Sequence, residues 1–242
     1  MKLISLNIWG GKIVKPLLSF FLNNSNIDIF CLQEVFNEGL SRRSVIKGWD
    51  MDIFRKISET LPEHIGFFKQ DQKNEEGVAM FVKKDLVIKD KGWILVHKWK
   101  NEVEADGCPL SKVLQWVRLG KGDKEYTVSH FHGLWHKSGK DDIPERIKQS
   151  GKVKTFLDSV SGPKIVCGDL NLNINTKSLE ILKKGMRELV TENNILSTRS
   201  SFYLKEPKHA DYMLVSKDIE VKEFKVLPNI VSDHLPLYLE FN

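Results

Sequence analysis

Short apolar runs alternate with helical patterns along this chain. Runs rich in Val, Ile and Phe predict ten strands, at Lys2–Ile8, Ile27–Leu32, Gly77–Val82, Leu86–Val96, Lys112–Leu119, Glu125–Phe131, Lys164–Cys167, Ala210–Val215, Glu220–Val226 and Leu235–Phe241. Apolar spacing between them predicts helices at Pro16–Asn24, Asp50–Leu61, Pro144–Val160 and Thr176–Glu188. Many strands with interspersed helices are typical of a layered α/β protein. No repeat or linker interrupts the pattern, so we expect one domain spanning residues 1–242.

Length and composition are those of a soluble globular protein. A chain of 242 residues buries roughly 70 to 75% of its unfolded surface, enough for one large core. No apolar run approaches the roughly 20 residues of a membrane span, so we expect no membrane partner. We also expect a monomer. Lys and Arg exceed Asp and Glu by 37 to 32. This mild excess would help to attract a polyanion but does not identify a substrate.

Cysteine usage and the amino terminus bear on the compartment. The first residues lack the 7-to-15-residue apolar core of a secretory signal. Cys31, Cys108 and Cys167 are odd in number and lack metal-binding spacing, and two of them lie in apolar strand-like runs. This usage suits buried thiols in a reducing environment, so we expect a cytoplasmic protein.

Polar side chains stand where several predicted strands end. Asn7 precedes a glycine turn and is a candidate ligand or orienting group. Glu34 follows an apolar run directly, and a hard cation such as Mg²⁺ prefers such oxygens. Asp169 and Asn171 would share one face if extended. An Asx-type turn is the alternative explanation of that segment, and for the segment taken alone it is the favoured one.

Histidines and further acids also lie beside the ends of predicted strands. His130 and His132 are two residues apart near a strand end, a spacing that would aim them alike, and Asp211 begins a strand. Asp233 and His234 adjoin the last strand, where the acid could hold a divalent cation and the imidazole a phosphate oxygen. Asp211 could then orient His234 through its other ring nitrogen. Each feature alone has a purely structural explanation, but their coincidence favours a catalytic site.

Taken in order, these motifs resemble the metal-dependent endonuclease/exonuclease/phosphatase superfamily, which includes deoxyribonuclease-like enzymes, sphingomyelinases and inositol polyphosphate 5-phosphatases. The matching segments span the chain and are Leu6-Asn7, Gln33-Glu34-Val35, Phe131-His132, Gly168-Asp169-Leu170-Asn171, Ala210-Asp211-Tyr212 and Ser232-Asp233-His234. The resemblance implies a four-layered α/β sandwich, with two mixed β-sheets packed face to face and helices outside. It places the active site where loops from both sheets converge.

The resemblance also implies roles for the acids. Glu34 corresponds to the principal Mg²⁺ ligand, with Asn7 and Asp233 close to the metal and Mn²⁺ as a substitute cation. Asp169 corresponds to the general base that takes a proton from the attacking water. Asn171 would help to fix that base and the phosphate.

The imidazoles correspond to phosphate-binding groups. His234, paired with Asp211, would stabilise the charge that accumulates in the transition state. His132 would contact another phosphate oxygen. A glutamate steadies this histidine in deoxyribonuclease-like members, and Glu76 is the candidate here.

Substrate signals are mixed. Abasic-site endonucleases usually carry tyrosine where this chain has His132, and their Asn-x-Asn-Gly pattern appears here as Asn7-Ile8-Trp9-Gly10. Both departures argue against a typical abasic-site endonuclease, and His132 resembles the residue of the deoxyribonuclease, sphingomyelinase and phosphatase branches. Trp9, Trp135, Lys137 and Lys140 are candidate substrate contacts, with the rings stacking on bases and the lysines meeting phosphates. Alternatively, Trp135 pins its loop to the core, an explanation that we slightly favour.

Three functions follow from this pattern. The first is a Mg²⁺-dependent nuclease or nucleic-acid phosphodiesterase that works by in-line attack of water. The second is a phosphoesterase for a small or lipid-derived phosphate, such as an inositol phosphatase or sphingomyelinase-like enzyme. The third, a catalytically inactive binding module, would require loss of a central group, yet all six central groups are present: Glu34, Asp169, Asn171, Asp211, Asp233 and His234.

Overall fold

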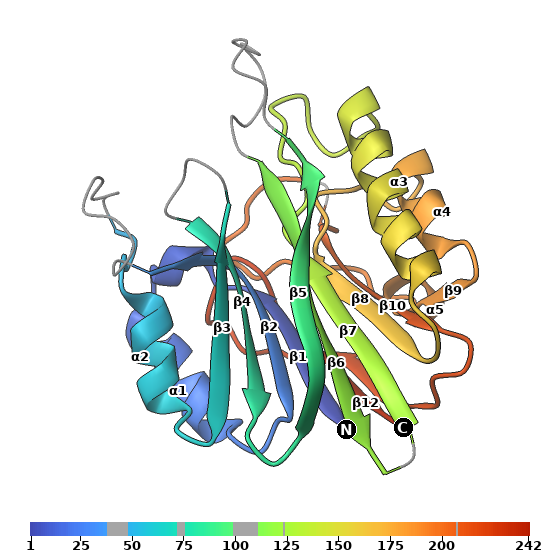
Figure 1. Cartoon of the computed structure of the whole chain (residues 1–242). Coiled ribbons are helices and arrows are strands. Elements are labelled where there is room, and N and C mark those ends of the chain that lie inside the picture. Colours follow the sequence, from blue (N-terminus) through green and yellow to red (C-terminus); the bar gives the residue numbers. More distant parts are fainter. Residues whose placement is uncertain (38–47, 72–75, 99–110, 123, 207) are drawn as a thin grey trace.

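The strands form two six-stranded sheets (Figure 1) in a computed structural model that describes residues 1–37, 48–71, 76–98, 111–122, 124–206 and 208–242. The first sheet has the order β11 (Val221–Val226), β12 (Leu237–Phe241), β1 (Lys2–Asn7), β2 (Ile29–Phe36), β4 (Glu76–Lys83) and β3 (His64–Gln70). The second has the order β5 (Val87–His97), β6 (Lys112–Lys121), β7 (Lys124–Phe131), β8 (Lys164–Asp169), β10 (Asp211–Ser216) and β9 (Met186–Glu188).

Both sheets are mixed. The pairs β1–β2 and β7–β8 are parallel, while the other neighbouring strands are antiparallel. In the first sheet β1 lies between β2 and β12, so the first and last strands of the chain are adjacent. Polar residues that follow strands from distant parts of the sequence can therefore meet at one edge of the sandwich.

Helices cover the two outer faces (Figure 1). Beside the first sheet lie α1 (Val14–Asn23) and α2 (Ile53–Thr60), and beside the second lie α3 (Pro144–Ser159), α4 (Lys177–Lys183) and α5 (Leu189–Glu192). A 3-10 turn, η1 (Trp9–Gly11), follows β1. The expected four-layered α/β sandwich is confirmed.

Strand alternation explains the layering, because successive side chains of a strand point to opposite faces. In β2, Ile29 and Cys31 belong to the core cluster between the sheets. The intervening Phe30 and Leu32 join a second cluster with Phe21 of α1 and other helical residues. Each central strand of the first sheet is therefore apolar on both faces, as its continuous apolar sequence predicts.

Two sequence predictions were wrong in detail. The helix expected at residues 176–188 ends at Lys183, since Gly185 has a left-handed φ of 75° and the chain then forms β9. Strand β3 was not predicted, because its sequence alternates poorly and its side chains are mostly half-buried. Neither difference moves a candidate site residue.

The cysteines and the helices bear on two further expectations. Cys31 and Cys167 are free and buried, as expected from their apolar runs, while Cys108 lies outside the described residues. Among the described helices, none combines the length and apolarity that crossing a membrane requires.

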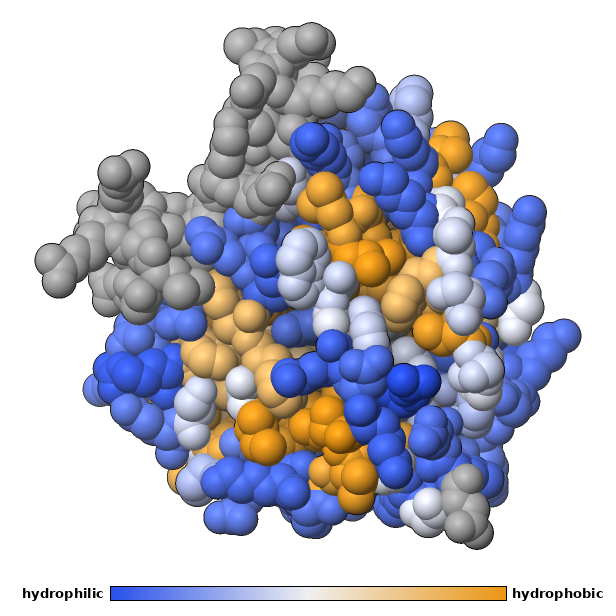
Figure 2. All heavy atoms as spheres, viewed as in Figure 1, coloured by the Kyte–Doolittle hydropathy of each residue, from blue (hydrophilic) through white to orange (hydrophobic). Residues whose placement is uncertain are grey.

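Apolar side chains also reach the surface between the edge strands β3 and β5. Figure 2 shows apolar residues gathered in the middle of this face, with hydrophilic residues around them. A cavity of about 510 Å³ lies here, lined by residues that include Phe67, Trp93 and Trp116. None of the catalytic candidates lines it.

Candidate active site

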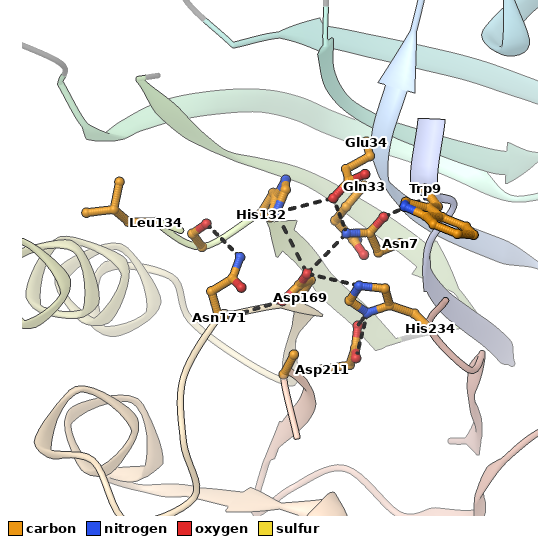
Figure 3. A network of polar contacts seen from close by, with 12 residues as sticks. Asn7, Trp9, Gln33, Glu34, His132, Leu134, Asp169, Asn171, Asp211 and His234 are labelled. Atoms are coloured by element: carbon orange, nitrogen blue, oxygen red, sulfur yellow. Dashed lines mark hydrogen bonds and ion pairs between the residues drawn. The ribbon is translucent and has the colours of Figure 1, made fainter. Parts of the chain in front are cut away.

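The polar residues singled out in the sequence come together at one end of the sandwich (Figure 3). They come from β1, β2, β4, β8 and β10, from the loops after β7 and β8 and from the loop before β12. They adjoin a cleft of about 960 Å³, which is lined by Trp9, Glu34, Glu76, His132, Trp135, Lys137, Asp169, Asn171, Asp233 and His234 together with residues that the sequence did not indicate. Asn7 and Asp211 are buried just beneath these groups.

The backbone is strained where it presents three of these residues. Trp9, Glu34 and Asn171 have φ values of 52°, 55° and 52°. A left-handed conformation disfavours residues with a side chain, and such outliers cluster at functional sites. At Glu34 the register with β4 shifts between Leu32 and Val35. Strand β2 thus continues to Phe36, and the irregular backbone within it carries the carboxylate at the cleft.

Asn7 connects the two central carboxylates. Its Nδ2 donates to Glu34 Oε1 at 2.8 Å and to Asp169 Oδ2 at 3.1 Å. Its Oδ1 accepts a hydrogen bond from the backbone N–H of Trp9 at 2.9 Å. The sequence made Asn7 a candidate metal ligand or orienting group. Its amide nitrogen, and not its oxygen, faces the acids, which is how an orienting group would be placed.

The acids and imidazoles form two groups that suit a divalent cation. Ligand atoms of Glu34, His132 and Asp169 lie within 4.8 Å of one another, and so do those of Asp169, Asp211 and His234. Burial and the neighbouring Glu76 raise the pKa of Glu34, a cost that a bound cation would relieve. Carboxylate oxygens are ligands for hard divalent cations, so the acids of these groups fit a divalent cation.

Asp233 lies at the cleft beside an arginine. It lines the cleft, but it is not a member of either group, and its Oδ2 lies 3.2 Å from Nη1 of Arg199. Its nearest group among the candidates is His234, with 3.8 Å between Oδ1 and Nε2. An ion pair with Arg199 therefore accompanies any role of Asp233 at the metal.

A buried chain of charges steadies His132. Its Nδ1 lies 3.2 Å from Glu76 Oε1, the partner expected from the sequence. Lys112 lies behind them, 3.7 Å from Glu76 and 2.9 Å from Asp71. Burial and Lys112 lower the pKa of His132, but Glu76 and Asp169 outweigh them and the net shift is upward. With Nδ1 held by Glu76, Nε2 faces Asp169 at 3.7 Å.

Asp169 is held as a carboxylate. Burial alone would raise its pKa, but the charges of His234, Arg199 and His132 bring the pKa well below the ordinary value. Its Oδ1 accepts a hydrogen bond from the backbone N–H of Asn171 at 3.0 Å. This is the Asx-type contact considered from the sequence, and it coexists with a position at the cleft. The Asn171 side chain donates to the Gly133 carbonyl at 3.2 Å.

His234 is oriented as expected. Its Nδ1 lies 2.8 Å from Asp211 Oδ1, and Thr198 donates to the other Asp211 oxygen at 2.8 Å. Burial lowers the pKa of His234, yet Asp211 and Asp169 raise it above the ordinary value while Arg199 works against them. The Nε2 atom is turned toward Asp169 at 3.4 Å, where a phosphate oxygen would be contacted.

His130 does not share the site with His132. It is fully buried, its Nδ1 lies 3.1 Å from Gln33 Nε2, and its Nε2 lies 2.9 Å from Gln115 Oε1. Burial lowers its pKa to about 3, so it is a neutral core group. The expected common direction fails because β7 ends at Phe131 and the chain leaves the strand before His132.

The rim of the cleft is aromatic and cationic. Trp135 is 51% exposed, so the explanation that it pins its loop to the core is wrong. Trp9 lies beside Phe202, with 5.9 Å between ring centroids, and Lys137 lines the same cleft. These side chains face the space that a substrate would enter.

Arg199 was not indicated by the sequence, whereas Lys140, like Lys137, was expected to meet phosphates. Arg199 Nη1 contacts His234 Nε2 closely, and Nη2 lies 3.9 Å from Asp169 Oδ2. Lys140 also lines the cleft and is 7% exposed. No motif marks Arg199. The isolated bridge that pairs Arg199 with His234 places the guanidinium beside the imidazole.

Comparison with known proteins agrees with this geometry. The model of the endonuclease/exonuclease/phosphatase family matches residues 4–234. The chain belongs to this family. None of the curated proteins matches the chain in sequence. Family membership explains why one acid and histidine cluster draws on strands of both sheets, and it supports a metal-dependent phosphoesterase.

Several solved structures of the endonuclease/exonuclease/phosphatase fold superimpose on the whole chain. A mannosyl-6-phosphatase of Bacteroides thetaiotaomicron has 18% identity and a TM-score of 0.75, with 100% of this chain and 99% of that one covered. D. rerio TDP2 complexed with a single-strand DNA product has 14% identity and a TM-score of 0.73, with coverage of 100% and 98%. The human Nocturnin catalytic domain with a bound sulfate anion has 17% identity and a TM-score of 0.67, with coverage of 100% and 93%. At these identities the likeness shows the fold.

Proposed function

We propose that the protein is a Mg²⁺-dependent phosphodiesterase that hydrolyses nucleic-acid strands. The observation that carries this proposal is the composition of the cleft. The acid and histidine cluster opens into about 960 Å³ of space whose walls carry both aromatic rings and cations, among them Trp9, Trp135, Phe202, Lys137 and Arg199. Rings that stack on bases and cations that meet phosphates are the features of single-strand binding grooves.

The residues divide the chemistry between them. Asp169 is ionised and accepts the proton of the attacking water. His234, oriented by Asp211, donates from Nε2 to a phosphate oxygen and stabilises the charge of the transition state. His132, held by Glu76, contacts a second oxygen. A divalent cation would be held by Glu34 and would supply Lewis-acid polarisation of the phosphate.

A second candidate is a phosphatase for a small phosphorylated molecule. It is favoured by one comparison, because a mannosyl-6-phosphatase shares the fold over the whole chain. A single phosphorylated sugar would occupy the catalytic centre but leave the aromatic rim without a function. We therefore place the nucleic-acid substrate first.

A substrate panel tests the proposal. Purified protein is incubated with Mg²⁺ or Mn²⁺, with and without a chelator, against single-stranded and double-stranded DNA, abasic duplex, RNA, phosphorylated sugars and inositols, and sphingomyelin. We expect chelator-sensitive cleavage of nucleic acid. Cleavage of the non-nucleotide phosphates alone would show that the second candidate is correct.

Two variants test the residue roles. Asp169→Asn and His234→Ala should each reduce turnover at least about a hundredfold, with circular dichroism unchanged. Asp158→Asn, which removes an exposed carboxylate from α3, is the matched control and should keep wild-type turnover. Turnover near that of the wild type in either site variant would contradict the assigned role.

A further inference from the structure

Three cations surround the ring of Tyr203 beside the active site. Arg199 Cζ lies 4.3 Å from the ring centroid, Lys140 Nζ 5.2 Å and Lys208 Nζ 5.6 Å. Tyr203, Arg199 and Lys140 line the catalytic cleft. A ring face attracts a cation, and the attraction is stronger when the cation is desolvated. The ring thus holds two cleft-lining cations in defined places.

Burial of these two cations is costly. Lys140 is 7% exposed and Arg199 is 8% exposed. Burial and the charge of Arg199 lower the pKa of Lys140 to about 8, which shows that the two positive charges repel each other. Clustered cations in a concave site are the usual means of binding phosphate, because an anion removes the repulsion.

Arg199 contacts acids of the catalytic centre, and Lys140 contacts a neighbouring loop. Arg199 is shared between Asp233 at 3.2 Å and Asp169 at 3.9 Å. Its Nε is buried without a hydrogen-bond partner among the residues that the structure describes. Lys140 donates to the carbonyl of His209 at 2.7 Å, which ties the loop of Lys140 to the loop before β10.

We propose that Lys140 and Arg199, on the ring of Tyr203, form an anion subsite that binds a second phosphate group of the substrate, next to the phosphate that is cleaved. The inference rests on the proposed function and names its substrate class as strands with phosphates at successive nucleotides. Arg199 touches His234 and so borders the cleaved phosphate, while Lys140 extends the positive charge toward the next one. A phosphodiester with a single phosphate would leave this subsite empty.

Kinetics on two substrates test the subsite. Lys140→Gln keeps a donor for the His209 carbonyl but removes the charge. We expect its KM for a single-stranded oligonucleotide to rise about tenfold or more. This is the loss of affinity expected when one charge-assisted hydrogen bond is removed. The KM for bis(p-nitrophenyl) phosphate, which has one phosphate, should stay within about twofold of the wild type. Lys140→Arg should restore the oligonucleotide KM.

Phosphate binding gives a readout that does not depend on turnover. Titration calorimetry with inorganic phosphate should show weaker binding in Lys140→Gln than in the wild type. Lys15→Gln removes an exposed charge from α1 and should leave phosphate affinity and both KM values unchanged. If Lys140→Gln does not fold, Tyr203→Leu replaces it in both measurements and should also raise the oligonucleotide KM.

The outcomes separate the subsite from the proposed function. An oligonucleotide KM in Lys140→Gln equal to that of the wild type would overturn the subsite while leaving the nuclease intact. An equal rise for both substrates, or a failure of Lys140→Arg to restore binding, would also overturn it. Absence of nucleic-acid cleavage in the wild type would refute the function, and weakened phosphate binding in Lys140→Gln would then still support the subsite.

Discussion

His234 Nδ1 lies 2.8 Å from Asp211 Oδ1, in a contact that joins the two sheets. Asp211 begins β10 in the second sheet, and His234 precedes β12 in the first. Replacement of such a carboxylate partner typically costs 10- to 100-fold in activity, because the imidazole loses its orientation and tautomer. We expect Asp211→Asn to lower kcat by about this factor with little change in KM, measured on the cleaved substrate at saturating Mg²⁺.

The comparison for Asp211→Asn is again the surface variant Asp158→Asn, which should match the wild type in kcat. Thermal unfolding of both proteins checks that the fold is retained. A kcat of Asp211→Asn within about twofold of the wild type would show that His234 does not depend on this carboxylate.

Lys112 compensates two buried acids, and its loss should destabilise the protein. The ion pair with Asp71 has 1% exposure on both side chains, and Glu76 lies 3.7 Å from the same ammonium. Removal of one partner of a buried pair costs about 3–5 kcal/mol, because the other charge stays buried. Lys112→Met should lower the free energy of unfolding by about this amount in urea titrations.

A double variant distinguishes charge from packing. Asp71→Asn combined with Lys112→Met removes the stranded carboxylate, so its loss should be smaller than the sum of the two single losses. Strict additivity would mean that Lys112 contributes by packing alone.

The pKa of Lys140 predicts how affinity depends on pH. Burial and Arg199 lower this pKa from 10.5 to about 8, while Asp169, Asp211 and Asp233 oppose the shift. Below pH 8 the ammonium is charged and binds phosphate, and above pH 8 it becomes neutral and that attraction is lost. The KM for an oligonucleotide should therefore rise between pH 7 and pH 9. In Lys140→Arg, whose guanidinium stays charged, the rise should disappear, and an unchanged rise would assign it to another group.

Arg146 holds the loop that carries Trp135 and Lys140. It is 1% exposed, and it donates to the carbonyls of Leu134 at 3.0 Å, Asp141 at 2.6 Å and Gly139 at 2.7 Å. Arg146→Met leaves these carbonyls without their donor, at a cost of about 2–4 kcal/mol in unfolding free energy. Hydrogen exchange should accelerate across residues 134–141.

Lys148→Met serves as the control for Arg146→Met, because it removes a cation of α3 that forms none of these bonds. It should leave exchange in the loop at the wild-type rate. If Arg146→Met also left it unchanged, the loop would be held by other contacts.

Residues that act at the ends of strands were visible in the sequence, because an apolar run marks the strand and the polar residue marks its end. Glu34, Asp169 and His234 were found in this way, although β2 continues past Glu34 to Phe36. Arg199 lies in a loop without such a pattern, and its partners Tyr203 and His234 are brought to it by the fold. Asn7 shows a related limit, since the sequence places the amide but cannot tell which of its two ends faces the acids.

The position of Glu34 destabilises the metal-free protein. Substitution of Glu34 should therefore weaken metal binding without lowering the unfolding temperature of the metal-free protein. Its backbone is left-handed, with a φ of 55°, and burial beside Glu76 raises the pKa of its carboxyl group. In Glu34→Gln the repulsion between the acids is removed, while the amide can still meet Asn7. We expect the metal-free variant to unfold at the same temperature as the wild type or a higher one.

The same variant should bind Mg²⁺ at least about tenfold more weakly, because a neutral amide replaces a charged ligand. Addition of Mg²⁺ therefore stabilises the wild type by mass action and shifts the Glu34→Gln protein much less. Thermal unfolding with and without Mg²⁺ measures both effects in one experiment. The alternative variant Glu63→Gln, which changes an exposed acid between α2 and β3, should respond to Mg²⁺ as the wild type does. Equal Mg²⁺-induced shifts in all three proteins would place the cation away from Glu34.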